Sequence, residues 1–289
     1  FNPQANATQA RTMEHFRRIG IAQEIRALGL PADHPTDIAY FTRFATHELA
    51  RLRLPTAAQA TEHVRALRGA WNAAELPHRV SQKFVEAVLR KHAEARTGRP
   101  VAFGWKLLDF DQDADGVNAR LAPADGKGPP VTVRARYLVG ADGARSTVRQ
   151  ALGVSYSGAT GVQRQFMGGR MFAVYLRAPT FYEQLPHDRA WMYVSVNSER
   201  RVFMASVDGR GEFAFHAAVH SDEDPSGWTH EDAKRLFAQA SGMAVPIEVL
   251  STGTWIAGHS LVAERYQQGR VFIAGDAAHL FTPTGGLGY

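Results

Sequence analysis

The chain has 289 residues, of which 45% are hydrophobic and 21% charged; this is a globular composition and excludes disordered, collagen-like and low-complexity classes. It has no cysteine, which excludes a disulfide scaffold, a Cys-ligated metal centre and a cysteine nucleophile. Lys and Arg exceed Asp and Glu by 33 to 28, for a formal net charge of +5, yet they are scattered rather than clustered, so we expect no nucleic-acid partner. Because no long apolar stretch and no signal peptide are visible, we expect no membrane partner and a cytoplasmic location.

The first third of the chain predicts two helices separated by a short β segment. Residues 12–28 have helical spacing, and residues 80–95 predict a second amphipathic helix with Ser81 as its N-cap. Between them, residues 38–41 and 49–54 predict two extended pieces joined by a turn.

The remainder is rich in strands. Strands are predicted at residues 105–113, 117–121 and 131–136, and a buried strand at 137–140. Alternating patterns at 171–176, 191–196, 202–207 and 213–219 then predict an antiparallel sheet. A helix is expected at residues 229–240 and a short buried strand at 271–274.

The first informative motif follows the strand that ends at Gly140. Small residues, Asp142 and Gly143 come next, and a helix begins near Ser146. In open α/β sheets, ligands bind beyond the carboxyl ends of strands, where small residues allow a close backbone approach and Arg145 could face a phosphate. The alternative is an Asp–Gly turn before a capped helix, and for Asp–Gly alone it is the stronger one.

The second motif repeats this construction at the strand that ends at Ala274. Gly275 and Asp276 follow it, then small residues and His279. An Asp here can bind the hydroxyls of a polyol, and later glycines let backbone amides approach a planar ring or a phosphate. Taken alone, His279 is more often structural than catalytic. The motif continues with Pro283, Gly285, Gly286 and Gly288.

Together the two motifs resemble the second and third FAD fingerprints of class A flavoprotein aromatic hydroxylases, the group of para-hydroxybenzoate hydroxylase and phenol hydroxylase. Residues 140–146 (GADGARS) are similar to the DG fingerprint, and residues 275–279 (GDAAH) with the downstream Pro and Gly are similar to the GD fingerprint. Residues 11–14 (RTME) and 81–89 also resemble family segments, in the same chain order.

The resemblance implies an α/β fold, α+β overall, in which a Rossmann-like parallel-sheet part binds FAD and an antiparallel sheet domain binds the substrate. The implied domains are 1–160 with 261–289 for FAD, with a β insertion near 36–55, and 161–260 for the substrate. The implied cofactor-binding residues are Arg11, Gln82, Asp142, Gly143, Arg145, Gly275, Asp276, Pro283, Gly285, Gly286, Leu287 and Gly288. For the substrate, the candidates are Met192, Tyr193 and Met204, although core packing is the stronger alternative for most of the middle-strand residues.

The resemblance further implies hydroxylation of a phenolic ring with FAD, NAD(P)H and dioxygen through a flavin hydroperoxide. The partner is then a small aromatic substrate, and a homodimer is a possible assembly. No catalytic base can be assigned. The alternatives are another FAD-dependent oxidoreductase of this fold, such as a halogenase or a reductase, or a non-catalytic remnant. The Trp-x-Trp motif of flavin halogenases does not occur in the sequence.

One departure from the family pattern is large. The expected N-terminal G-x-G-x-x-G turn and its acidic ribose ligand do not occur in the sequence. We therefore expect a fragment of a longer protein that also lacks the C-terminal region, with the adenosine half of the cofactor site supplied elsewhere.

Two further patterns carry less weight. His216 and His220 have an i, i+4 spacing, but they lie in a predicted strand and an acidic loop, so no metal site is expected. Gly258-His259-Ser260 begins like a nucleophile elbow, but Val262 replaces the closing Gly, which argues against a serine hydrolase.

Overall fold

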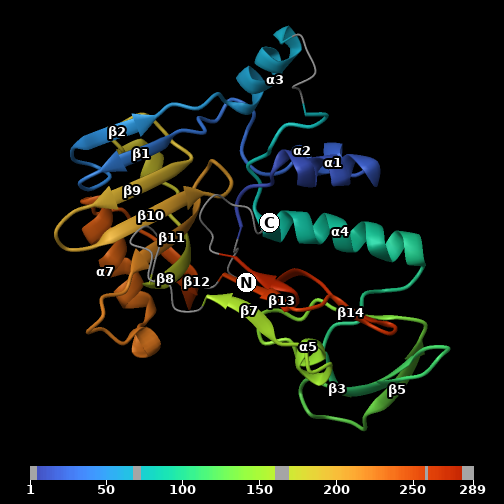
Figure 1. Cartoon of the computed structure of the whole chain (residues 1–289). Coiled ribbons are helices and arrows are strands. Elements are labelled where there is room, and N and C mark those ends of the chain that lie inside the picture. Colours follow the sequence, from blue (N-terminus) through green and yellow to red (C-terminus); the bar gives the residue numbers. More distant parts are fainter. Residues whose placement is uncertain (1–4, 68–72, 160–168, 258–259, 282–289) are drawn as a thin grey trace. The chain divides into compact units, whose positions relative to one another are not determined.

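The computed structural model describes residues 5–67, 73–159, 169–257 and 260–281 (Figure 1). The chain forms two compact units. The first combines Phe1–Ala93 with Gly169–Ile256, and the second combines Glu94–Gly168 with Ala257–Gly288. Both contain strands and helices, so the predicted mixed α/β class is confirmed.

A seven-stranded sheet in the order β12-β8-β11-β10-β9-β1-β2 forms the body of the first unit. The strands β8 to β11 pair antiparallel, as the sequence predicted, and β1 joins β9 in parallel. Its strands are β1 (Ile38–Phe41), β2 (Glu48–Leu52), β8 (Gly169–Arg177), β9 (Met192–Val196), β10 (Arg201–Ser206), β11 (Glu212–Ala218) and β12 (Glu248–Ala257). Its helices are α1 (Ala10–Arg18), α2 (Ala22–Arg26), α3 (Ala57–Ala66), α4 (Gln82–Thr97, whose last turn belongs to the second unit), α6 (Phe181–Gln184), η1 (Pro225–Gly227) and α7 (His230–Ser241).

Alternation along the strands decides which face of this sheet forms the main core. On β8, Phe172, Val174 and Leu176 are buried together with Leu236 and Phe237 of α7. The intervening residues of β8 point to the other face, because successive strand side chains alternate. Helix α7 begins at a capping box in which Thr229 and Asp232 satisfy each other's backbone N–H groups. The core therefore lies between the sheet and α7.

The helices near the N-terminus form a second cluster. Met13 and Ile25 are buried with Val85 of α4. The single helix expected over residues 12–28 is two helices, because Gly20 has a φ of 81° that breaks the first one. Ser81 was expected to cap α4, and this is wrong: its Oγ is buried with no hydrogen-bond partner.

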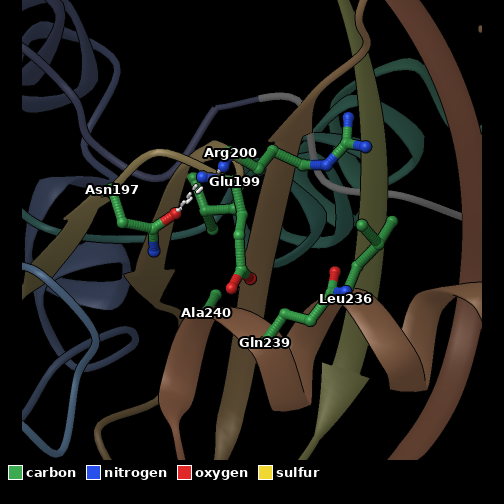
Figure 2. Close-up of a pocket in the computed structure, with 7 residues that line it drawn as sticks. Asn197, Glu199, Arg200, Leu236, Gln239 and Ala240 are labelled. Carbon is green, nitrogen blue, oxygen red and sulfur yellow. Dashed lines mark hydrogen bonds between the residues drawn. The ribbon is translucent and has the colours of Figure 1, made fainter.

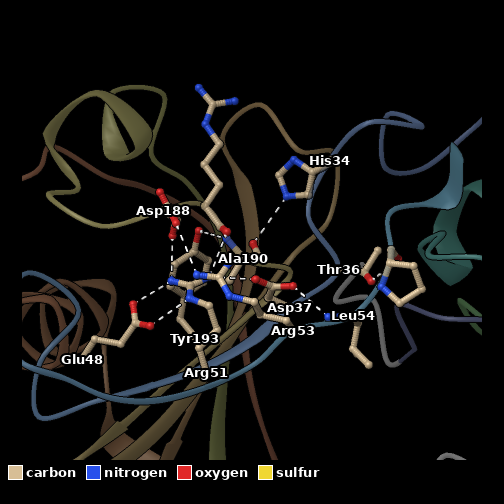
Figure 3. Close-up of polar contacts among 12 residues, drawn as sticks. His34, Thr36, Asp37, Glu48, Arg51, Arg53, Leu54, Asp188, Ala190 and Tyr193 are labelled. Carbon is tan, nitrogen blue, oxygen red and sulfur yellow. Dashed lines mark hydrogen bonds and ion pairs between the residues drawn. The ribbon is translucent and has the colours of Figure 1, made fainter. Parts of the chain in front are cut away.

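A buried arginine side chain fixes the β1–β2 hairpin to the segment that precedes β9 (Figure 3). The Arg51 side chain is 5% exposed and lies 3.2 Å from an oxygen of Asp37 and 2.7 Å from one of Glu48. It also donates to the backbone carbonyls of Asp188 and Arg189. The hydrogen bonds from Arg51 lower the pKa of Glu48. The two carboxylates and two carbonyls satisfy this guanidinium, so the group is structural.

The second unit consists of three small sheets, with orders β3-β4-β5, β14-β15-β6 and β16-β13-β7. In the middle one, β6 and β15 are parallel neighbours. The elements are β3 (Trp105–Gln112), β4 (Val117–Pro123), β5 (Val131–Ala135), β6 (Leu138–Gly140), α5 (Thr147–Ala151), β7 (Tyr156–Ala159), β13 (Ser260–Ala263), β14 (Gln267–Gln268), β15 (Val271–Ile273), η2 (Gly275–Ala277) and β16 (His279–Leu280).

The strand predicted as buried at residues 137–140 is only partly buried. Val139 is 59% exposed, whereas Gly140 is buried. The reason is that β6 is the edge strand of its sheet within the described ranges.

The compact units divide the chain differently from the predicted domains. Residues 1–93 share a unit with 169–256, although residues 1–160 were expected to belong to the FAD-binding part. The pairing of β1 with β9 explains the difference: it brings the hairpin into the antiparallel sheet across more than half of the chain.

Candidate functional site

Two parallel strands of the second unit bring the two sequence motifs together. In the register of β6 and β15, Leu138 is opposite Val271 and Gly140 is opposite Ile273. The backbone N–H of Ala274 donates to the carbonyl of Gly140 at 2.9 Å. The prediction that these strands share one sheet is confirmed. The loops that carry Asp142 and Asp276 therefore both begin at the carboxyl ends of these two strands. This is the end of the strands at which α/β sheets bind ligands.

At the first loop, glycine is needed at two positions for two different structural reasons. A Cβ on Gly140 would lie 2.5 Å from Cβ of Val148, so only glycine lets α5 pack this closely on β6. Gly143 has a φ of 81°, a left-handed conformation that side chains rarely adopt, and nothing lies near the place of its missing Cβ. The helix then begins at Ser146, whose Oγ accepts from the N–H of Arg149 at 2.9 Å.

Asp142 caps this same helix. One carboxylate oxygen accepts from the Ser146 hydroxyl at 2.5 Å and the other accepts from the N–H of Val148 at 3.2 Å. Partial burial acts to raise the pKa of Asp142, but these hydrogen bonds outweigh it and the net pKa is lowered. The structure thus shows the capped turn that the sequence left open as the alternative. The role of Asp142 toward a cofactor stays a prediction.

In the second loop, Asp276 has the opposite character. Asp276 is exposed, and within the described ranges its carboxylate has no hydrogen-bond or ion-pair partner. The preceding Gly275 has a φ of 57°, and nothing lies within 4 Å of where its Cβ would be. A ligand can therefore approach both the backbone and a free carboxylate at this strand end.

A chain of contacts that the sequence analysis missed joins the two loops. The guanidinium of Arg149 lies 3.8 Å from the ring centroid of Tyr156 and donates to the Ala144 carbonyl at 2.9 Å. The hydroxyl of Tyr156 in turn donates to the backbone carbonyl of Asp276 at 2.5 Å. An Arg in the helix after Asp–Gly and a Tyr on the next strand are the only sequence signals of this link.

The remaining predicted cofactor residues are dispersed. Arg11 is exposed and pairs with Glu14 at 3.0 Å, and Gln82 donates to Glu86 at 2.6 Å; both belong to helices of the first unit. Arg145 is exposed on the first loop. Five predicted residues lie outside the described ranges: Pro283, Gly285, Gly286, Leu287 and Gly288.

The three substrate candidates lie on opposite faces of the seven-stranded sheet. Tyr193 and Met204 are fully buried in the core beneath α7, where a substrate could not reach them without opening the core. Burial raises the pKa of Tyr193 well above its ordinary value. Met192 is half-buried and packs on the other face, in a cluster with Trp191.

Other features of the described residues do not form a competing site. A small pocket lies between the β9–β10 turn and α7 (Figure 2), but its charges are already used, because Glu199 pairs with Arg43 and Arg200 pairs with Glu223. The part of the chain that the structure describes holds no group of three His, Asp or Glu arranged like metal ligands. Likewise, none of its helices is long and apolar enough to cross a membrane.

A mixed α/β fold in which two glycine-containing loops, each with an Asp, follow adjacent parallel strands is typical of domains that bind flavin or dinucleotide cofactors. A comparison with known protein families identifies the cofactor more specifically than the fold does, because residues 1–289 match the FAD binding domain family. The chain belongs to this family, and FAD is the cofactor that the family binds.

The curated relatives are oxygenases. The chain is 30% identical to tetracenomycin B2 monooxygenase-dioxygenase of Streptomyces olivaceus, with 100% of this chain and 53% of the relative covered. It is 33% identical to aklavinone 12-hydroxylase DnrF of Streptomyces peucetius subsp. caesius (99% and 56% covered). It is 29% identical to 2,4-dichlorophenol 6-monooxygenase of Cupriavidus pinatubonensis (99% and 47% covered).

Solved structures agree with this assignment. The flavin-dependent monooxygenase PieE in complex with FAD and substrate has a TM-score of 0.84 and 27% identity, with 100% of this chain and 48% of that chain covered. The rebeccamycin biosynthetic enzyme RebC with reduced flavin has a TM-score of 0.81 and 32% identity, with 99% and 51% covered. The chain thus spans about half the length of the relatives it matches.

Proposed function

We propose that the complete protein is an FAD-dependent monooxygenase that hydroxylates a phenolic or other aromatic small molecule with NAD(P)H and dioxygen. The observation that carries this proposal is the parallel pairing of β6 and β15, which brings the loops that carry Asp142 and Asp276 to the same end of the strands. The names of the relatives support it, since they are called monooxygenases and hydroxylases.

The described residues fit a flavin cofactor. The free carboxylate of Asp276 can accept hydrogen bonds from the hydroxyls of the ribityl chain, and Gly275 leaves room for the chain to approach. Arg145 is the cation that we assign to the pyrophosphate region. The Tyr156–Asp276 contact holds the backbone of the second loop, so that the carboxylate is positioned before the cofactor binds.

When bound, FAD supplies hydride acceptance and dioxygen activation, which accounts for a sequence without an evident nucleophile or catalytic dyad. The protein's task is to orient the aromatic ring and to exclude water from the reacting centre. We assign the orienting surface to the face of the seven-stranded sheet opposite α7, because the α7 face is filled by the protein's own core.

The test uses the complete natural protein, purified with FAD and supplied with NADH or NADPH and a panel of phenols under ¹⁸O-labelled dioxygen. We expect flavin absorbance in the purified protein, reductant oxidation stimulated by at least one phenol, and one labelled oxygen in the product. A protein that retains flavin and oxidises reductant but releases only hydrogen peroxide with every phenol tested would contradict hydroxylation.

A further inference from the structure

The sheet face opposite α7 carries an aromatic cluster that the FAD fingerprints do not explain. It consists of Phe203 on β10, His216 on β11 and Trp255 on β12. The rings of Phe203 and His216 are stacked, with centroids 4.5 Å apart and planes at 14°. The rings of His216 and Trp255 meet edge to face at 5.8 Å. All three residues belong to the first unit.

The β register explains how these rings meet. Phe203 lies directly opposite His216 in the β10–β11 pair, and His216 lies opposite Ala173 in the β11–β8 pair. Strand β8 separates β11 from β12, and its residue opposite His216 is the small Ala173.

A hydrogen bond fixes the tautomer of His216. The indole Nε1–H of Trp255 lies 3.0 Å from Nδ1 of His216. Indole nitrogen can only donate, so Nδ1 must be the unprotonated acceptor and the proton of the neutral ring must reside on Nε2. Burial lowers the pKa of His216 to about 4, which keeps the ring neutral at pH 7.

The Nε2–H group is left without a protein partner. His216 is 8% exposed, and within the described ranges its only polar contact is the one from Trp255. Nε2 is not among the buried side-chain atoms without a partner in these ranges, so solvent reaches this nitrogen and a ligand can reach it too. Phe203 and Trp255 thus hold the ring, while Nε2 stays available as a donor.

We propose that His216 is a substrate-positioning residue, whose Nε2–H donates a hydrogen bond to an oxygen substituent of a planar aromatic substrate stacked along Phe203 and Trp255. Trp255 is a positioning residue that acts through His216 by setting its tautomer. This inference rests on the proposed function and adds to it a site and a substrate feature: a fused or extended ring system that bears a phenolic or carbonyl oxygen.

The first test measures binding to the full-length holoenzyme, with 2-naphthol as the probe and 2-methylnaphthalene as its matched control. One neutral hydrogen bond predicts that the wild type prefers 2-naphthol by about three- to tenfold. His216→Phe keeps an aromatic ring beside Phe203 but lacks the donor, so it should bind 2-naphthol and 2-methylnaphthalene with equal affinity. His216→Gln restores a donor near the Nε2 position and should recover part of the preference. His63→Phe, at an exposed position of α3, is the control.

The second test reads the tautomer without any ligand. Nitrogen-15 chemical shifts of the His216 ring at pH 7 should show a protonated Nε2 and an unprotonated Nδ1, and Trp255→Phe should mix the two tautomers and weaken the 2-naphthol preference. A protonated Nδ1 in the wild type, or a preference that His216→Phe leaves intact, would overturn the inference. Failure of the proposed function would instead appear as wild-type protein that binds 2-naphthol but hydroxylates no phenol.

Discussion

Asp142 and Asp276 follow adjacent strands, yet their carboxylates have different surroundings. Asp142 accepts from a hydroxyl and a backbone N–H at the start of α5, whereas Asp276 has no partner in the part of the chain that the structure describes. Similar sequence patterns thus produce a structural carboxylate at one strand end and an available one at the other.

This contrast predicts the effect of Asp142→Asn. The substitution removes the charge that favours the N-terminus of α5 and weakens two hydrogen bonds, so we expect a loss of about 1 kcal/mol in the free energy of unfolding. Thermal or urea unfolding of the full-length protein measures this loss. The control is Asp125→Asn in an exposed turn of the second unit, which should cost less. Equal stability of Asp142→Asn and wild type would argue against the capping role.

At the scale of elements, the contact between β6 and α5 depends on the absence of a side chain at Gly140. A Cβ there would lie 2.5 Å from Val148. We therefore expect Gly140→Ala to destabilise the protein by about 1–3 kcal/mol through overpacking. Gly253→Ala on β12 is the matched control, because nothing lies within 4 Å of the added Cβ.

A double variant distinguishes overpacking from other causes. Val148→Ala removes the two methyl groups that would lie 2.8 and 2.9 Å from the new Cβ, although it keeps the Val148 Cβ at 2.5 Å. Gly140→Ala should therefore cost less in its presence, with a coupling of at least 0.5 kcal/mol in a double-mutant cycle. Simple additivity of the two changes would contradict the packing explanation.

Local sequence was sufficient for elements whose signals are local. The helix expected at residues 229–240 is observed as His230–Ser241, since the Thr229–Asp232 capping box marks its start. The pairing of β6 with β15 could also be predicted, because both fingerprints must serve one cofactor. The parallel pairing of β1 with β9 could not, since no local signal connects segments so distant in sequence.

The side-chain roles show the same limit. Alternation along β9 indicates that Met192 and Tyr193 point to opposite faces, but only the tertiary structure shows that α7 covers the face of Tyr193. Ser81 has the sequence signature of an N-cap, yet its hydroxyl has no hydrogen-bond partner. The link from Arg149 through Tyr156 to Asp276 depends on the placement of β7 and was not predicted from sequence.

For the whole molecule, one ion pair beside the large sheet predicts how stability depends on pH. Arg200 binds Glu223 through two hydrogen bonds, one of 2.8 Å and one of 2.5 Å. These bonds lower the pKa of Glu223 to about 2 in the folded protein. Because the folded pKa lies below the unfolded one, the stabilisation is present above about pH 4.5 and is lost as the pH falls toward 2.

The variant Glu223→Gln tests this dependence. At pH 7 it should be less stable than wild type by about 1 kcal/mol, since the pair is partly exposed, and the difference should shrink as the pH falls. Melting temperatures measured from pH 7 to pH 2.5 show the trend, with Glu231→Gln on the exposed start of α7 as the control. A difference that stays constant with pH would contradict the assigned pKa.

In the proposed function, the free carboxylate of Asp276, at the end of a parallel strand pair, holds the flavin cofactor. Equilibrium dialysis of FAD against the full-length protein, comparing wild type with Asp276→Asn, tests it most directly. A hydrogen bond to a charged group contributes about 1.5–3 kcal/mol, so we predict that FAD affinity falls by roughly ten- to a hundredfold while the unfolding transition stays unchanged. Equal FAD affinity in both proteins, with both correctly folded, would contradict the account.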